Sequence, residues 1–136
     1  LHTAYRRQRQ MCIRDSYDTP DGSCIRDFIN VVDLAKAHVI AIRRILEQKQ
    51  KEKVEVFNIG TGRGVSVLEL INGFEKATGV KLNYQIVGRR AGDIEKVWAN
   101  PDYANQELGW KAVETLEDTL RSAWNWQLKL RERGIQ

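Results

Sequence analysis

The spacing of apolar residues along the chain predicts short strands that alternate with amphipathic helices. Residues 25–32 are rich in β-branched and aromatic side chains, which predicts a strand. Apolar residues then recur every third or fourth position, which predicts a helix capped by Asp33 and continuing to about Gln48. Residues 54–59 form a short apolar run, and we expect them to be a second, buried strand.

Start and stop signals frame the next two elements. Ser66 is followed three positions later by Glu69, and this capping box predicts a helix that ends before Gly79. Residues 82–87 alternate in polarity and predict a third strand, which a charged loop follows.

Two further helices are predicted near the C-terminus. Asn100 and Pro101 indicate a helix start with proline at the first position, and Gly109 indicates its end. Thr115 predicts the cap of a last helix that continues toward Arg133. The order β-α-β-α-β-loop-α-α is typical of an α/β fold with parallel pairing across at least one crossover.

The first sixteen residues differ from the rest of the chain. Residues 1–16 show neither helical nor strand periodicity, so we expect a disordered or foreign leader followed by a folded part over residues 17–136. The net charge of the whole chain is +4. Four arginines against one aspartate place +3 of it on residues 1–16, which leaves +1 for the folded part. Because nucleic-acid binding needs that charge on a folded surface, we expect no nucleic-acid partner.

Composition narrows the class further. The chain is 42% hydrophobic and 29% charged, which is typical of a chain with a packed core and excludes low-complexity disorder. No apolar run approaches the roughly 18 residues of a membrane span, so no membrane association is expected. Cys12 and Cys24 have no partners for a metal site, and as free thiols they favour a cytoplasmic location.

The glycine-rich segment at residues 60–64 is the obvious candidate for a cofactor loop. A dinucleotide fingerprint requires glycine or alanine where Val65 stands, and an acidic residue about 20 positions later; neither is present. A tight strand-to-helix turn is therefore the preferred interpretation. None of the four tyrosines precedes a lysine at the Tyr-x-x-x-Lys spacing used in hydride chemistry. We assign no catalytic, cofactor-binding or metal-binding residue to this chain.

Arginine and aspartate side chains are the remaining candidates for ligand binding. Arg26 begins a predicted strand, while Arg90 and Asp93 share a loop that contains Gly92. The planar fork of arginine suits bidentate phosphate contacts, and loops on a rigid scaffold commonly carry binding groups. By composition alone, ordinary solvated charges remain the alternative interpretation.

Several segments resemble the C-terminal part of UDP-glucose 4-epimerases, which belong to the extended short-chain dehydrogenase class. The resemblance covers about residues 17–136, and the combination of Arg-Asp-Phe-Ile-x-Val-x-Asp-Leu with Trp-x-Trp-Gln is its most specific part. The matching segments are residues 21–35, 57–62, 66–69, 89–93, 107–111 and 124–127. The fold implied is the C-terminal substrate-binding part of an extended Rossmann-type nucleotide-sugar epimerase, without its cofactor domain.

This resemblance implies an enzymatic activity to which the chain would contribute only together with the N-terminal half of the family's proteins. The family interconverts UDP-glucose and UDP-galactose in galactose metabolism, with NAD taking a hydride from C4 of the sugar and returning it to the other face. The NAD loop and the Tyr-x-x-x-Lys pair lie in an N-terminal half that this chain lacks. We therefore expect the chain to be inactive alone, and the full-length parent to be a homodimer.

The resemblance also implies roles for four residues. Arg26 and Arg90 would contact the diphosphate, Asp93 would contact the uridine ribose, and Phe28 would stand where an aromatic residue lines the nucleotide. Val97 replaces a tyrosine found in some members, so no contact is expected there. Another nucleotide-sugar epimerase, dehydratase or decarboxylase, or a non-catalytic nucleotide-sugar-binding module, remains the alternative.

Overall fold

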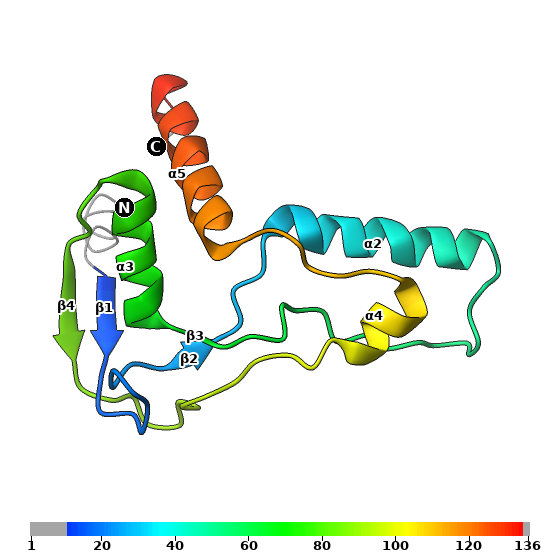
Figure 1. The fold of residues 1–136 in the computed structure, drawn as a ribbon, viewed down its shortest axis with the longest axis horizontal. Coiled ribbons are helices and arrows are strands. Elements are labelled where there is room, and N and C mark those ends of the chain that lie inside the picture. Colours follow the sequence, from blue (N-terminus) through cyan, green and yellow to red (C-terminus); the bar gives the residue numbers. More distant parts are fainter. Residues whose placement is uncertain (1–10, 135–136) are drawn as a thin grey trace.

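The computed structural model describes residues 11–134, and the fold is shown in Figure 1. In chain order its elements are β1 (Met11–Arg14), β2 (Ile25–Arg26), α2 (Val31–Leu46), β3 (Val65–Ser66), α3 (Val67–Thr78), β4 (Tyr84–Val87), α4 (Asp102–Leu108) and α5 (Leu116–Glu132). This mixture of helices and strands agrees with the predicted class. No helix within residues 11–134 is long and apolar enough to cross a bilayer.

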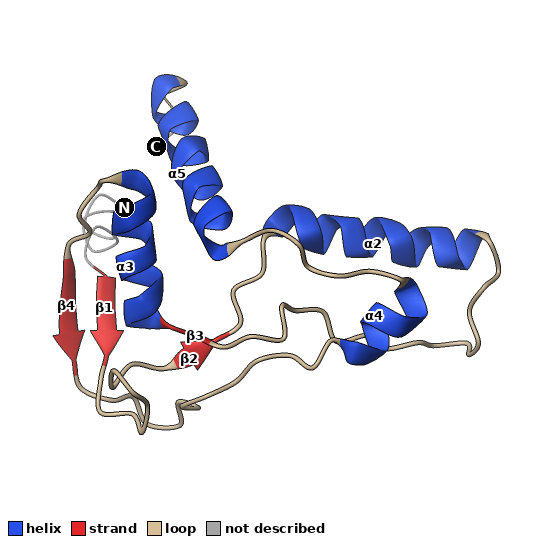
Figure 2. Ribbon diagram, in the orientation of Figure 1, coloured by secondary structure: helices blue, strands red, loops and turns tan. Residues whose placement is uncertain are grey.

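The elements gather on two sides of the molecule. β1 pairs in parallel with β4, and these strands lie beside α3, which packs against α5. On the other side, α2 lies near α4. Long loops cross between the two sides, and within them β2 pairs antiparallel with β3 (Figure 2).

Two of the three predicted helix caps of the second half are confirmed, whereas α4 begins one residue later than predicted, with Pro101 at the cap position and the Asn100 side-chain oxygen accepting the Asp102 N–H at 3.0 Å. The Ser66 hydroxyl accepts the backbone N–H of Glu69 at 3.0 Å at the start of α3. The Thr115 hydroxyl accepts the N–H of Asp118 at 3.1 Å at the start of α5. Each contact satisfies an N–H that has no partner within its helix, so these boundaries follow from local chemistry.

The start of α2 differs from the prediction. Asn30 is the cap, because its side-chain oxygen accepts the N–H of Val32 at 2.8 Å. The predicted cap, Asp33, lies inside the helix and is fully buried. Because the helix begins this early, the strand predicted over residues 25–32 is limited to Ile25–Arg26.

The strand predicted over residues 54–59 is also wrong. The structure assigns no strand there, and the side chains of Val54 and Val56 are 79% and 78% exposed. A strand forms by hydrogen bonding along a neighbouring strand, and none of the pairings within residues 11–134 includes this segment. Apolar character alone therefore did not produce the strand.

The disorder predicted for residues 1–16 does not hold at Met11–Arg14, which form β1. Ile13 is buried beside β4, and the Arg14 guanidinium donates to the Gly88 carbonyl oxygen at 3.1 Å. Pairing with β4 supplies the hydrogen bonds that the sequence pattern did not reveal. Residues 1–10 lie outside the described part of the chain.

The main apolar contact joins α3 and α5. Ile71 is 1% exposed, and Phe74 meets Trp124 edge to face at a centroid distance of 5.7 Å. Trp126, two positions further along α5, is 57% exposed. The sequence indicates that only one of these two tryptophans can face the core, and the structure confirms it.

A cluster of charged side chains joins α2 to α4. The Arg44 guanidinium forms two 2.8 Å contacts with the Glu55 carboxylate and donates to the Glu107 carbonyl oxygen at 3.1 Å. The Lys51 ammonium group donates to the Glu107 carboxylate at 2.6 Å. The hydrogen bonds and charge of Arg44 lower the pKa of Glu55 to about 2. Long-range ion pairs thus hold α2 to the segment that follows it and to α4.

Candidate functional site

Strand β2 brings Arg26 next to the loop that carries the other predicted charges. The Ile25 N–H donates to the Glu95 carbonyl oxygen at 2.9 Å, and the Val97 N–H donates to the Ile25 carbonyl oxygen at 3.1 Å. Residues 95–97 therefore run along one edge of β2 while β3 pairs with the other edge. Backbone hydrogen bonds, rather than side chains, set this arrangement.

The Arg26 side chain points along the backbone of that loop. Its guanidinium donates to the carbonyl oxygens of Ile94 at 2.6 Å, Ile25 at 2.8 Å and Glu95 at 3.4 Å. A guanidinium has five N–H groups, so these contacts leave Nε–H and one Nη2–H for a ligand. Arg26 is thus held in place while it keeps donors for an anion.

The two adjacent arginines of the loop have different surroundings. Arg89 forms an ion pair with Glu95 at 2.7 Å, and its guanidinium lies 4.9 Å from the centroid of the Tyr17 ring. Arg90 is exposed, and its side chain makes no hydrogen bond or ion pair with any residue between 11 and 134. Of the two, only Arg90 presents an unused guanidinium to solvent.

Asp93 is held at the other end of the same turn. Its backbone N–H donates to the Arg90 carbonyl oxygen at 3.3 Å, and Gly92 takes the positive φ of 79° that the turn requires. The Tyr17 hydroxyl donates to Asp93 Oδ2 at 2.8 Å. Burial, assisted by the hydrogen bond to Asp93, raises the pKa of Tyr17. The turn places Arg90 and Asp93 three residues apart on one exposed loop.

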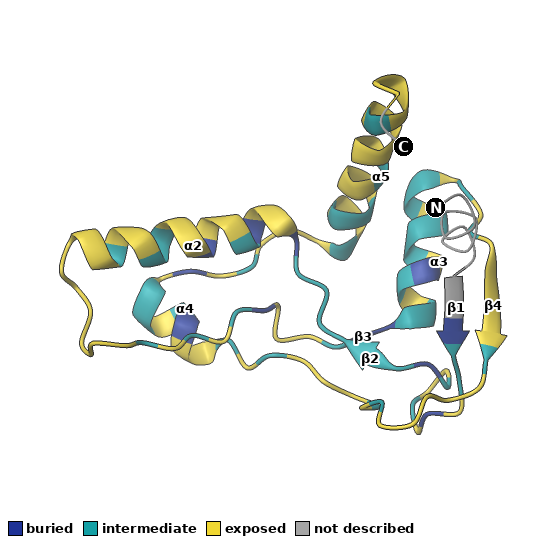
Figure 3. Ribbon diagram, turned by 180° about the vertical axis from the view of Figure 1, so that it is seen from behind, coloured by how far each residue is buried: buried dark blue, intermediate teal, exposed yellow. Residues whose placement is uncertain are grey.

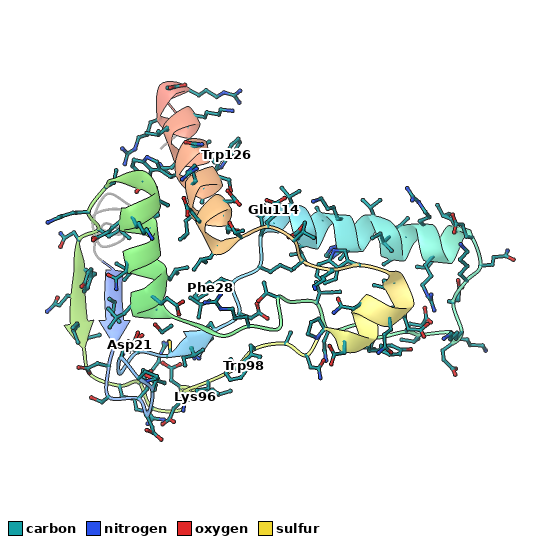
Figure 4. The ribbon with its side chains drawn as sticks, viewed as in Figure 1. Asp21, Phe28, Lys96, Trp98, Glu114 and Trp126 are labelled. Atoms are coloured by element: carbon teal, nitrogen blue, oxygen red, sulfur yellow. The ribbon has the colours of Figure 1, made fainter. Side chains whose placement is uncertain are left out.

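Phe28 lies outside this cluster of contacts. It stands on the segment between β2 and α2 and is partly exposed (Figure 4). No hydrogen bond or ring contact within the described residues joins it to Arg26, Arg90 or Asp93. Arg26 therefore lies against the backbone of residues 94 and 95, next to Asp93, whereas no contact within the described residues joins Arg90 to Arg26, and Phe28 stays on the adjoining segment.

Asp27 supports the site and was not among the predicted residues. Its carboxylate accepts the Thr61 hydroxyl at 2.6 Å, the Thr61 N–H at 3.1 Å, and the N–H groups of Gly62 and Ala99 at 3.3 Å. The glycine-rich segment at residues 60–64 is thereby fastened to the residue that follows β2. Only the tertiary structure could reveal this role, because Asp27 and its partners are far apart in the sequence.

The glycine-rich turn is shaped by this packing. A Cβ at Gly60 would overlap Asp27 Oδ2 and would lie 2.6 Å from the Ala99 Cβ. The N–H groups of Thr61 and Gly62 already bind a carboxylate, so they are unavailable to a cofactor phosphate. These contacts support the interpretation of residues 60–64 as a structural turn.

A cavity of about 420 Å³ opens beside Arg26. Its lining carries one cation, Arg26, and one carboxylate, Asp27, and the exposed Trp98 contributes an apolar surface (Figure 4). The lining residues are Arg26, Asp27, Asn58, Ile59, Val97, Trp98, Ala99 and Asn100. A pocket that combines an arginine, side-chain amides and an aromatic surface suits a phosphorylated ligand with a planar or sugar group.

Comparison with known proteins places the chain in a class. No family model matches the sequence. Individual proteins do match, and they are nucleotide-sugar epimerases. More particularly, the UDP-glucose 4-epimerase of Bifidobacterium longum is 52% identical over 115 residues, which are 85% of this chain and 33% of that protein.

Solved structures agree with this result. The UDP-glucose 4-epimerase of Stenotrophomonas maltophila, with bound NAD and formylated UDP-arabinopyranose, superposes with a TM-score of 0.84 at 42% identity, over 91% of this chain and 36% of that one. The Bifidobacterium longum enzyme in complex with NAD+ and UDP superposes with a TM-score of 0.80 at 50% identity, over 88% of this chain and 35% of that one. The chain thus spans about a third of its relatives, and the matched third is C-terminal. The predicted resemblance and fold class are confirmed.

Proposed function

We propose that residues 17–136 form the UDP-sugar-binding part of an NAD-dependent UDP-glucose 4-epimerase, which interconverts UDP-glucose and UDP-galactose. The observation that carries the proposal is the loop at residues 89–97. It carries Arg90 and Asp93 on one turn, and its backbone accepts hydrogen bonds from Arg26, in a chain that is 52% identical to a UDP-glucose 4-epimerase. An exposed, unpaired arginine on the same turn as a carboxylate, together with an arginine held by the loop backbone, is suited to a diphosphate joined to a ribose.

In this proposal Arg26 and Arg90 bind the diphosphate, Asp93 accepts a hydrogen bond from a ribose hydroxyl, and Phe28 lines the nucleotide. The two related structures hold UDP and a UDP-sugar derivative, so the UDP group is common to both. Arg26 is fixed by three carbonyl contacts before any ligand arrives, which reduces the entropy lost on binding.

NAD does not fit the described residues of this chain. The glycine-rich turn at residues 60–64 binds Asp27 through its N–H groups, and even an added Cβ at Gly60 would overlap Asp27. NAD would therefore be held by the part of the relatives that this chain does not cover, where it would supply the hydride acceptor for C4. The residues of this chain bind and orient the UDP group, so we expect the chain alone not to epimerise.

Other features of the proposal follow the relatives. We propose that the longer protein is a cytoplasmic homodimer acting in galactose metabolism. The free thiol of Cys24 agrees with a reducing compartment. The arabinopyranose derivative in one related structure favours a second candidate, an enzyme of the same class with a different sugar preference.

A chimera tests the proposed function. Residues 17–136 would replace the matched C-terminal third of the Bifidobacterium longum relative, and conversion of UDP-galactose to UDP-glucose would be measured. We expect turnover by the chimera and none by the 136-residue chain. A folded chimera without turnover on UDP-galactose, but active on UDP-N-acetylglucosamine or UDP-glucuronate, would favour the second candidate. Absence of UDP binding would contradict the proposal altogether.

A further inference from the structure

Tyr17 is a buried residue whose side chain reaches the candidate site, where it contacts Asp93. Its side chain is only 4% exposed, although it lies on the loop between β1 and β2. The backbone around it is fixed, because its N–H donates to the Gly22 carbonyl oxygen at 3.1 Å and its own carbonyl oxygen accepts the Thr19 N–H at 2.8 Å. The side chain therefore projects from a rigid turn.

The side chain of Arg89, from the loop at residues 89–97, covers the face of the Tyr17 ring. The Arg89 guanidinium lies 4.9 Å from the ring centroid and is itself held by Glu95 at 2.7 Å. A cation over an aromatic face is attractive, and the ion pair keeps the guanidinium in place. The hydrogen-bonded backbone turn and the Arg89 guanidinium thus orient the phenol independently of its hydroxyl contact.

The hydroxyl contact leaves half of the Asp93 carboxylate available. Oδ2 accepts the Tyr17 hydroxyl at 2.8 Å, whereas Oδ1 has no hydrogen bond with any of residues 11–134. Burial and the Asp93 carboxylate both raise the pKa of Tyr17, so the phenol stays protonated and remains a donor. A carboxylate fixed through one oxygen presents the other in a defined direction.

We propose that Tyr17 is a positioning residue, which holds the Asp93 carboxylate so that Oδ1 meets the ribose of the bound nucleotide. The proposal rests on the proposed function, in which Asp93 binds that ribose. Tyr17 does not contact the ligand. It removes rotational freedom from Asp93 in the free protein, so less entropy is lost when UDP binds.

The test compares two ligands that differ only at the ribose. The affinities of UDP and 2′,3′-dideoxy-UDP are measured by calorimetry in the 136-residue chain and in the chimera, with and without Tyr17→Phe. We expect the variant to weaken UDP binding roughly three- to tenfold, the effect of one hydrogen bond, and to leave the dideoxy ligand unaffected. In the chimera, KM should rise while kcat stays unchanged.

Tyr103→Phe is the matched control. The Tyr103 ring stacks on Phe57 at a centroid distance of 5.4 Å, and its hydroxyl has no hydrogen bond within the described residues. This variant should therefore change neither the affinity for UDP nor that for 2′,3′-dideoxy-UDP. The ratio of the two affinities is unaffected by partial unfolding, because both ligands encounter the same folded fraction. Combining Tyr17→Phe with Asp93→Ala should give no loss beyond that of Asp93→Ala alone, since Tyr17 is proposed to act only through the Asp93 carboxylate.

The outcomes separate this inference from the proposed function. If Tyr17→Phe weakens both ligands equally, or weakens neither, Tyr17 does not act through the ribose contact and the inference is wrong. If the unmodified protein binds both ligands equally well, Asp93 does not bind the ribose, and its assigned role fails together with that of Tyr17. If the unmodified protein does not bind UDP at all, the proposed function itself is wrong.

Discussion

The two sides of the molecule bury their apolar residues to different extents (Figure 3). Between α3 and α5, Ile71 is almost fully enclosed, and Gly73 allows Leu120 to approach closely. Along α2 only Ala37 among the apolar residues is buried, while Ile42 is 58% exposed. This side buries its centre by contacts within the chain, although Ile86 on β4 and Trp126 on α5 remain more than half exposed.

The other side depends on charge. α2 is joined to α4 by the Arg44 cluster, while the exposed apolar residues of α2 and of residues 54–59 have no cover within residues 11–134. The chain spans a third of its relatives, and we propose that the remainder of such a protein covers these residues. An amphipathic helix thus shows by its exposed face where a partner segment is required.

Matched isoleucine variants give the largest expected difference between the two sides. Ile71→Ala should lower the free energy of unfolding by about 2–5 kcal/mol, because it leaves a cavity between α3 and α5. Ile42→Ala should change it by less than about 0.5 kcal/mol, since that side chain is mostly exposed. Urea titration measures both. Equal losses would show that α2 is covered in solution, for instance by self-association.

A glycine pair tests the turn at which the two sides meet. Gly60→Ala should lower the free energy of unfolding by about 1–3 kcal/mol, since the added methyl group overlaps Asp27 and Ala99. Gly88→Ala is the control, because no atom lies within 4 Å of its Cβ position. Thermal melting of the two variants is the measurement. A stable Gly60→Ala protein would contradict the role assigned to Asp27.

Lysine substitutions test the site that lies between the two sides. Arg26→Lys and Arg90→Lys should each weaken UDP binding by about tenfold, because an ammonium group cannot form a two-pronged contact. Arg121→Lys on α5 is the control, since Arg121 pairs only with Glu117 among the described residues. Calorimetric titration with UDP measures all three. Unchanged affinity in both site variants would return these arginines to the class of solvated charges.

Acid should weaken the ion pairs between α2 and α4, and this is the smallest effect expected. Arg44 depresses the pKa of Glu55 to about 2 in the folded protein, from 4.5 without this contact. The stabilisation is therefore complete above about pH 4.5 and is lost as the pH falls toward 2. Amide hydrogen exchange should show weaker protection of α2 and α4 over this interval. Glu55→Gln should remove the pH-dependent part of that change, and persistence of the full change would contradict the assignment.

Features that depend on neighbours in sequence were predictable from the sequence alone. The caps at Ser66 and Thr115 use donors three residues away, so their helices follow from local hydrogen bonding. The resemblance to UDP-glucose 4-epimerases, carried by short motifs, also needed no structure. Asn30 was missed as the cap of α2 because Asp33 is an equally good cap by residue type, and only the fold shows that its carboxylate is used elsewhere.

The tertiary structure decided every role that depends on a distant partner. Asp33 accepts the N–H groups of Val113 and Glu114, which are about eighty positions away, and Tyr17 reaches Asp93 across a similar separation. The run at residues 54–59 has the composition of a strand but remains unpaired. Composition determines which groups need a partner, whereas chain topology determines whether that partner lies within reach, because a hydrogen bond requires contact at about 3 Å.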